Sequence, residues 1–500
     1  MKKYISIIIL GLSFTAAQSQ ETVDAVRFSQ DNLNGTARFR AMGGAFGALG
    51  GDFSAINVNP AGSAIFANNQ VAITLSSYNT NNKSSYFGSG TSESDFTFDL
   101  NQAGGVFVFD NDAEKSDWRK VTLAVNYENS ANFDNTIFTA GFNPSNSVGN
   151  YFLSYANQNG GVPLNILQNS FYEELNYADG QAFLGYQGFI INPVEEAPNN
   201  TLYVTNVPSG GNFYQENSFV STGYNGKVSF NAAAQYKERL YIGINLNSHF
   251  TDYRQSTSFY EENQNNIAAG IQRFRFNNDL YTYGSGFSFQ LGAIAKVTEE
   301  FRLGLAYESP TWYRLNDELS QSLSSVRIDD ATDESITTIV DPQVILIYDT
   351  YKLQTPGKWT GSLAYVFGKT GLISIDYSIK DYSRTQFGPE SDFMTVNNQM
   401  SDVLDTAAEL RIGAEHRIKQ WSLRAGYRME ESPYKNGKTV GDLTGYSGGL
   451  GYNFGNTKLD ISYSYSQRDS EQPFFSQGFT DAPQIETINN NVSLTVVFEL

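Results

Sequence analysis

Cysteine is absent from this 500-residue chain, and histidine occurs only twice. Thiol chemistry, disulfide bonds and thiolate-bound metals are therefore excluded. The two histidines, His249 and His416, are isolated in the sequence and show no metal-ligand spacing. A catalytic nucleophile needs a nearby base and an orienting group, and no Ser/His/Asp set is indicated. The sequence therefore predicts a protein that is not an enzyme and that binds no metal or cofactor.

Long apolar runs and excess positive charge are also missing. No stretch approaches 18 consecutive apolar residues, so no transmembrane helix is expected. The chain has 33 basic and 52 acidic residues, a net charge of −19, which argues strongly against nucleic-acid binding. We interpret the paired carboxylates Glu173-Glu174 and Glu261-Glu262 as solvated loop residues. An acidic surface of this kind fits loops exposed to water.

The first 19 residues read as a secretory signal peptide. Lys2 and Lys3 precede an apolar run from Ile5 to Leu12 that is too short to span a bilayer. Residues 17–19 fit the small-x-small cleavage rule, and the alternative is a short buried strand. Loss of the two lysines would bring the net charge from −19 to −21. An exported, strand-rich chain without long apolar runs indicates the outer membrane of a diderm bacterium.

Alternation of apolar and polar residues dominates the rest of the chain. From Val492 to Leu500, for example, apolar side chains occupy every second position. Successive side chains of a strand point to opposite faces, so the pattern indicates one apolar and one polar face. In a soluble sandwich the apolar face would form a core. In an outer-membrane barrel it would contact lipid, while the polar face would line the lumen.

Connector lengths favour the barrel. We expect fourteen strands, near 70–80, 95–110, 118–131, 219–236, 240–254, 281–297, 301–313, 358–368, 371–383, 405–418, 421–431, 442–454 and 457–468, and a last one ending at Leu500. Links after even-numbered strands are short, and links after odd-numbered strands are long. Outer-membrane barrels have short periplasmic turns and long outer loops. We therefore predict an all-β fold, a 14-stranded antiparallel transmembrane β-barrel over residues 70–500, with a long extracellular loop at about 132–217.

Charged and aromatic side chains on these strands each allow two interpretations. Arg411, Arg424 and Arg428 lie on predicted lumen faces among acidic residues. They could form a structural charge ladder, or they could bind the carboxylate of a ligand. The aromatic residues near strand ends favour interfacial girdles over a ligand-stacking role; they are Tyr307, Trp312, Tyr313, Trp359, Tyr365, Trp421 and Tyr427.

Residues 20–69 break the alternation. Small residues dominate from Gly35 to Gly62, which permits tight turns and close packing in a confined space. No strand precedes these glycines and no Gly-Lys-Ser/Thr follows, so a phosphate-binding loop is not indicated. Such a segment cannot cover a lipid-facing surface, but it could plug the lumen. We predict a hatch over residues 20–69.

The Gly-rich segment ending in Asn59-Pro60-Ala61-Gly62 resembles the hatch of the FadL/TodX family of long-chain fatty-acid transporters. Stretches later in the chain are also similar to that family; they are 302–313, 355–365, 410–417 and 423–427. The resemblance implies a fourteen-stranded barrel with Asn59, Pro60 and Ala61 as its hatch motif. It also implies that hydrophobic molecules enter a lumen pocket and leave sideways into the membrane near a kinked third strand.

Two features of this chain depart from the family pattern. The predicted third strand, Val121 to Ala131, contains no Gly or Pro to explain a kink, although Asn126 and Asn129 could occupy one. The long excursion after it contains apolar pieces at 151–153, 164–167 and 183–186. These pieces could form an external apolar landing site for ligands, or they could pack the loop together.

Two function hypotheses follow. The first is uptake of hydrophobic small molecules such as long-chain fatty acids, through a lumen pocket gated by the hatch and in contact with outer-membrane lipid. The alternative is a structural or partner subunit of an outer-membrane secretion or assembly complex, associated with other outer-membrane proteins. A transporter should have an apolar pocket between hatch and wall with a basic group at its end. A partner subunit should have a filled lumen and exposed apolar residues on its loops.

Overall fold

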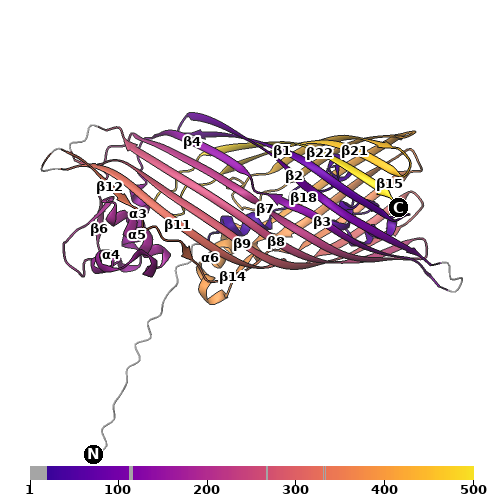
Figure 1. Cartoon of the computed structure of the whole chain (residues 1–500), viewed down its shortest axis with the longest axis horizontal. Coiled ribbons are helices and arrows are strands. Elements are labelled where there is room, and N and C mark those ends of the chain that lie inside the picture. Colours follow the sequence, from indigo (N-terminus) through magenta and orange to yellow (C-terminus); the bar gives the residue numbers. More distant parts are fainter. Residues whose placement is uncertain (1–19, 112–115, 266–268, 330–331, 333) are drawn as a thin grey trace, which may run out of the picture.

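The computed structural model describes residues 20–500 except 112–115, 266–268, 330–331 and 333. The predicted signal peptide, residues 1–19, lies outside the described residues. Antiparallel strands pair around a closed circuit in the order β1, β2, β3, β7, β8, β9, β10, β15, β16, β18, β19, β20, β21 and β22 (Figure 1). β22 pairs back with β1 from Gln70↔Glu499 to Ser85↔Gln484, which closes the sheet. The predicted fourteen-stranded barrel is thereby confirmed.

The bounds of the circuit strands are β1 Gln70–Tyr86, β2 Ser89–Asp110, β3 Trp118–Asn132, β7 Phe213–Tyr236, β8 Leu240–Asn263, β9 Gly270–Lys296, β10 Phe301–Glu308, β15 Lys358–Phe367, β16 Gly371–Asp381, β18 Thr406–Ile418, β19 Trp421–Glu430, β20 Leu443–Asn453, β21 Thr457–Glu471 and β22 Gln484–Glu499. Additional strands continue the wall at the long-loop end: β4 Asn135–Asn143, β11 Trp312–Ile328, β12 Ser335–Val340, β13 Leu346–Ile347, β14 Tyr351–Gln354 and β17 Gln386–Gly388.

Five strand predictions, for the first, second, fifth, sixth and seventh strands, were wrong at the long-loop end. β1 and β2 continue to Tyr86 and Ser89, so a two-residue turn replaces the long link expected there. β8 and β9 extend toward each other as far as Asn263 and Gly270. The stretch expected at 301–313 is interrupted around Pro310, because proline supplies no backbone donor to the ladder. Beyond the membrane, outward positions need no apolar side chains, so the alternation used for prediction ends before the strands do.

The faces of the wall follow the predicted alternation. On β16, Ile373, Ile375 and Ile379 point outward and are exposed, while Ser374 and Asp376 point inward and are buried. Most of the predicted girdle residues also point outward. Tyr313 is the exception: it is 2 % exposed and packs inside the lumen. It follows Trp312, which is exposed, so strand parity alone places it on the inner face.

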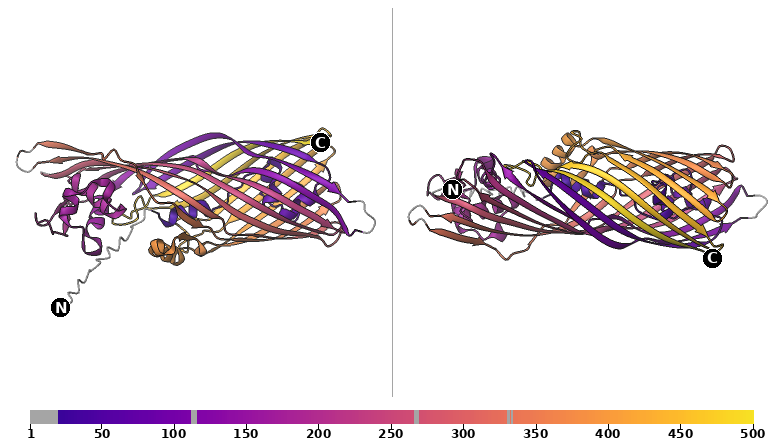
Figure 2. Two further views of the ribbon diagram at one scale, coloured as in Figure 1. Left: turned by 60° about the horizontal axis from the view of Figure 1, so that its bottom comes forward. Right: turned by 90° about the horizontal axis from the view of Figure 1, so that it is seen from above.

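The hatch fills the lumen. Its elements are α1 Thr22–Ser29, α2 Ala37–Ala41, η1 Ser54–Asn57 and η2 Pro60–Ile65, seen as indigo turns inside the barrel (Figure 2). Glycines of both the hatch and the wall permit contacts that a Cβ would block. A Cβ on Gly304 of β10 would lie 2.3 Å from the carbonyl oxygen of Gly47. The close approach of hatch and wall therefore depends on small residues on both sides.

Residues 144–212 form a cap at the long-loop end. Its helices are α3 Gly149–Asn157, α4 Leu164–Asn169 and α5 Tyr177–Gln187, and β5 Ile191–Pro193 pairs with β6 Tyr203–Thr205. Phe152, Leu167 and Leu184 of the cap join one buried cluster with Phe274 and Phe276 of β9. The apolar pieces of the excursion therefore pack the loop together. The cap contains no Lys, Arg or His.

The structure corrects the expectation that Glu261 is a solvated loop residue. It lies in β8, not in a loop, and is 1 % exposed. Its carboxylate accepts a hydrogen bond from the backbone N–H of Val148 at 2.9 Å and from Gln215 at 2.7 Å. Glu173 and Glu174 are exposed, as expected. The buried carboxylate ties the start of the cap to the wall.

No helix in the described part of the chain is long and apolar enough to cross a bilayer.

Replacing Gly304 by Ala should loosen the hatch, because its Cβ would clash with the Gly47 carbonyl oxygen. Overpacking of this kind costs about 1–3 kcal/mol. The Gly304→Ala barrel should show higher single-channel conductance than wild type. Gly361→Ala is the matched control, since a Cβ there meets no atom within 4 Å. Equal conductance in wild type and both variants would contradict the close-packing argument.

Candidate functional site

The predicted hatch motif lies where the hatch contacts the wall. The Asn59 side chain accepts a hydrogen bond from the backbone N–H of Ala61 at 3.1 Å. It donates to the carbonyl oxygens of Gly47 at 2.7 Å and of Ala293 in β9 at 3.0 Å. Pro60 begins η2, where a missing backbone donor carries no cost. Asn59 thus links two hatch turns and the wall through one side chain.

The three predicted arginines lie in the lumen wall, and each contacts acidic side chains. Arg411 pairs with Glu409, and Arg428 lies 2.9 Å from the same carboxylate. Arg424 pairs with Glu415 at 2.7 Å and with Asp460 at 2.6 Å. The side chains of all three arginines are less than one-tenth exposed. This arrangement supports the structural charge ladder, because each arginine already has its carboxylates.

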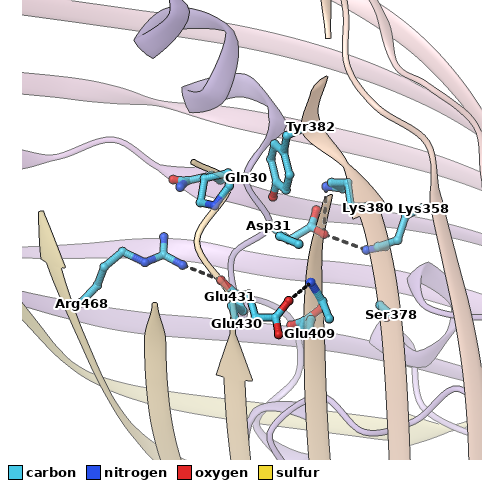
Figure 3. A pocket seen from close by; sticks show the side chains of 13 residues that line it. Gln30, Asp31, Lys358, Ser378, Lys380, Tyr382, Glu409, Glu430, Glu431 and Arg468 are labelled. Atoms are coloured by element: carbon cyan, nitrogen blue, oxygen red, sulfur yellow. Dashed lines mark hydrogen bonds and ion pairs between the residues drawn. The ribbon is translucent and has the colours of Figure 1, made fainter. Parts of the chain in front are cut away.

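A second charged cluster joins the hatch to the wall. The Asp31 carboxylate lies 2.9 Å from Lys358 Nζ of β15 and 3.1 Å from Lys380 Nζ of β16 (Figure 3). Lys358 also lies 3.5 Å from Glu308. A cavity of about 30 Å³ borders Asp31 and both lysines, together with Tyr382, Glu409, Glu430 and Arg468. The cluster is a polar latch between the segment after α1 and two wall strands.

The charge of Asp31 is held by its two lysines. Burial raises the pKa of the Asp31 carboxyl, but Lys358 and Lys380 outweigh burial and hold that pKa well below its usual range. A depressed folded pKa means that the latch stabilises the docked hatch at any pH above the unfolded value of about 3.9. The stabilisation is lost as the pH falls through the lower, folded value. The latch is therefore closed at neutral pH.

An apolar cluster adjoins the latch, and α1 is packed in it. Ala25, Val26 and Phe28 of α1 are buried there. Its walls are formed by residues far apart in the sequence: Tyr253, Tyr313, Leu315, Tyr351, Leu353, Tyr382, Phe387, Phe393, Met400, Leu404, Ala407, Tyr434 and Val440. The rings of Phe28 and Tyr313 lie 6.0 Å apart. Sequence reasoning missed this cluster because each element contributes only one to three isolated residues.

The wall has a seam beside β3. β2 pairs with β3 only from Gln102↔Glu128 to Asp110↔Lys120. Beyond this stretch β3 has a bulge between Asn129 and Ala131, and β4 pairs with β7. Within the described residues no backbone ladder joins the upper part of β2 to β3 or β4. Side chains bridge it instead, among them Asn132 Nδ2 to Thr97 Oγ1 at 3.3 Å.

Comparisons with known proteins agree with this architecture. A family model described as outer membrane protein transport protein (OMPP1/FadL/TodX) matches residues 208–491. The crystal structure of a Pseudomonas aeruginosa FadL homologue is similar, with 11% identity and a TM-score of 0.54, over 94% of this chain and 99% of that chain. The Pseudomonas putida toluene transporter TodX has 14% identity and a TM-score of 0.51, over 94% and 100%. A search of curated proteins found no match.

A closed barrel with an apolar outer face and a plug in its lumen defines an outer-membrane transport protein, not an enzyme. The family model covers more than half of the chain, and the chain belongs to the OMPP1/FadL/TodX family of outer-membrane transport proteins. Outer-membrane barrels have short periplasmic turns and long outer loops, so the prediction that the long loop with its cap is extracellular is kept as a prediction.

Replacing Asn59 by Ala should loosen η1 and η2, because the carbonyl oxygens of Gly47 and Ala293 lose a buried donor. A buried polar group left unsatisfied costs about 1–3 kcal/mol. Hydrogen exchange of backbone amides in residues 54–65 should become faster.

Asn68→Ala is the control for this variant. Asn68 is exposed and bonds only to the exposed end of the wall, at Glu499. Exchange rates in residues 54–65 that stay at the wild-type level in Asn59→Ala would show that the motif does not hold the hatch.

Proposed function

We propose that this channel takes up hydrophobic small molecules that carry a carboxylate, long-chain fatty acids among them, and that the ligand displaces α1 of the hatch. The observation that carries the proposal is the apolar cluster around α1 next to the Lys358–Lys380 pair. A transporter was expected to have an apolar pocket between hatch and wall with a basic group at its end, and α1 with Asp31 fills the corresponding place here. The toluene transport named for the similar TodX structure supports a hydrophobic substrate.

The hatch segment already satisfies both halves of this site. Val26 and Phe28 supply apolar surface to the aromatic walls, and Asp31 supplies a carboxylate to the lysines. A fatty acid offers the same two chemistries in one molecule. Burial of its chain would contribute about 25 cal/mol for each Å² of apolar surface removed from water. The carboxylate of the fatty acid would take the place of the Asp31 carboxylate at Lys358 and Lys380. Both are charge-assisted contacts, so the exchange leaves no lysine unpaired.

The arginines predicted from the sequence take a secondary part in the proposal. Arg411 and Arg428 hold Glu409, which borders the same cavity as the lysines. A ligand carboxylate that displaced Glu409 would meet these two arginines. Arg424, paired with Glu415 and Asp460, belongs to the charge ladder in this proposal. The first carboxylate contact is therefore placed at the lysines.

The seam between β2 and the β3–β4 side supports a lateral exit into the membrane. Backbone ladders hold the other neighbours, whereas hydrogen bonds between side chains bridge this stretch. Exchanging such bonds for bonds to water or ligand costs little, since a typical net contribution is about 0.5–1.5 kcal/mol each. The third strand has no glycine or proline to explain a kink, and Asn129 lies next to the bulge in this strand.

A second function, as partner subunit of an outer-membrane assembly, is favoured by one observation. Ile339, Ile345 and Ile347 at the long-loop end are 73%, 61% and 74% exposed. The hatch also fills the lumen, which fits a non-transporting subunit equally well. Exposed isoleucines without a membrane around them are typical of protein contacts.

The lysine pair can be tested with a fatty acid and the fatty alcohol of the same chain length. In a Lys358→Met/Lys380→Met barrel, fatty-acid affinity should fall about tenfold or more, because a charge-assisted contact is lost. Affinity for the alcohol should stay unchanged. Asp31→Asn should act in the opposite direction and raise fatty-acid affinity, since it frees the lysines. Isothermal titration calorimetry in detergent measures the affinity of both variants for both ligands.

Arg384→Met serves as the control, because Arg384 is an exposed cation paired with Asp381 at the long-loop end. It should bind both ligands like wild type. If the lysine variant lost acid and alcohol binding equally, the proposed headgroup site would be wrong, although an apolar pocket would remain.

A crosslink tests the lateral exit. The chain has no cysteine, so Thr97→Cys/Asn132→Cys introduces one defined disulfide across the seam. Uptake of labelled fatty acid into whole cells should stop on oxidation and recover with reductant. Thr80→Cys/Asn489→Cys is the matched pair, since these side chains bond at 2.8 Å across the fully paired β1 and β22. Undiminished uptake through the oxidised Thr97–Asn132 barrel would rule out an exit here.

A further inference from the structure

The strand β12 lies at an open edge of the sheet. It pairs with β11 over its whole length, Ser335–Val340, and no other strand of the described residues pairs with it. Figure 1 shows β12 beside the cap helices at the long-loop end of the barrel. The inward side of this stretch is covered, since Val340, Val344 and Leu346 pack against the apolar cluster of the cap. The second edge of β12 therefore has no strand beside it among the described residues.

The register of the hairpin shows which backbone groups point to that edge. The N–H of Asp329 donates to the carbonyl oxygen of Glu334 at 3.0 Å, so these two residues are a hydrogen-bonded pair of the ladder. Bonded and non-bonded pairs alternate along antiparallel strands. The backbone groups of Ser335, Thr337 and Ile339 therefore point away from β11. Each of these residues offers one N–H and one C=O to a further strand.

β12 lacks the features that usually protect an exposed edge. Natural edge strands often carry lysine, proline or a bulge, which keep other strands from pairing with them. The sequence of β12 is Ser-Ile-Thr-Thr-Ile-Val, without charge, proline or glycine. Five of its six residues are β-branched, a type with high strand propensity. An open edge of this composition is suited to strand addition.

Acidic residues flank this uncharged strand. Glu334 directly precedes β12 and Asp341 directly follows it, and both are exposed. No lysine or arginine occurs between Arg327 and Lys352. Two copies of β12 paired antiparallel around Thr337 would bring Glu334 of each copy beside Asp341 of the other, and facing like charges are destabilising. A strand with a cation at each end fits this edge better than a second copy of the chain.

The cations of the neighbouring strands lie away from the free edge. Arg273 and Arg275 are exposed, but they lie on β9, and β11 separates β9 from β12. At about 4.8 Å per strand, an added strand beyond β12 would lie about 14 Å from β9. Arg327 of β11 pairs with Asp329 and lies over the Phe189 ring of the cap. The charges next to the ends of an added strand are therefore acidic.

From these observations we infer that the free edge of β12 binds an extended segment of another protein, which adds a strand to the sheet and carries a Lys or Arg at each end. Backbone hydrogen bonds to Thr337 and its neighbours supply affinity, and an apolar side chain of the segment packs beside Ile339, which is 73% exposed. Its cations meet Glu334 and Asp341, which are seven positions apart. The inference rests on the partner-subunit function proposed above and is independent of the transport proposal.

Thr337→Pro tests the edge. Proline removes the N–H that points to the added strand, whereas the bonds between β12 and β11 do not use that N–H, so the hairpin should stay paired. The probe is a labelled octapeptide with Lys at both ends and alternating Thr and Val between them, added to the full-length barrel in detergent. Its affinity, measured by fluorescence anisotropy, should fall about tenfold or more. Heat-modifiable migration verifies that the variant is folded.

Thr337→Val is the matched control, because it keeps the backbone N–H and changes only an exposed side chain. It should bind the octapeptide like wild type. Ile339→Lys is a second test that leaves the backbone unchanged. It adds the kind of residue that guards natural edge strands and repels the lysines of the probe, so affinity should again fall about tenfold.

The charge argument is tested with an octapeptide that has Glu in place of Lys at both ends, which wild type should bind about tenfold more weakly. Three results would overturn the proposal: no binding of the Lys-ended peptide by wild type, unchanged affinity in Thr337→Pro, or equal affinity for the two peptides. A concentration-dependent wild-type dimer that Thr337→Pro abolishes would overturn it in favour of a second copy of the chain. A partner protein that co-purifies equally with wild type and Thr337→Pro would uphold the partner-subunit function and overturn this contact.

Discussion

Closure of the sheet by β1 and β22 is the constraint on which the rest of the structure depends. Lipid offers no hydrogen-bond partner to the backbone, so every membrane strand must pair on both sides. A ring of fourteen strands satisfies that requirement and leaves a lumen too wide for its own side chains to fill. The hatch fills it. Because inward wall positions are largely polar, hydrogen bonds and ion pairs hold the hatch, supported by close glycine contacts and small apolar clusters.

The strength of these contacts is uneven along the hatch, and the difference bears on function. Around Asn59 the hatch and wall exchange buried hydrogen bonds that a hydrophobic ligand cannot reproduce. Around α1 and Asp31 the contacts are an apolar surface and one carboxylate, which an amphiphile can replace completely. We therefore propose that the part of the hatch around Asn59 stays docked during uptake and that the part around α1 and Asp31 exchanges with ligand. The wall repeats this contrast, since a backbone ladder joins β1 to β2, whereas side chains bridge the upper part of β2 to β3 and β4.

The sequence predicted the barrel well and the proposed binding site poorly, for separate physical reasons. Alternation arises from the lipid-facing side, so strands such as β16 were placed almost to the residue, whereas the polar upper part of β1 was missed. The charge ladder of Arg411 and its neighbours was visible because several charges recur on adjacent strands. Lys358 and Lys380 are single lysines on different strands, and only the barrel register brings them to Asp31. The buried Glu261 was misjudged because nothing local marks the cap that covers it.

The cap's composition has a consequence for its survival outside the cell. No lysine or arginine occurs between Lys120 and Lys227, a stretch that includes the whole cap. Trypsin-like proteases cleave after those residues and therefore find no peptide bond to cut within the cap. Its fold, held by the aromatic cluster and by Glu261, is protected from this class of enzyme by sequence alone. This resistance comes from the sequence, so it would persist even where the cap unfolds.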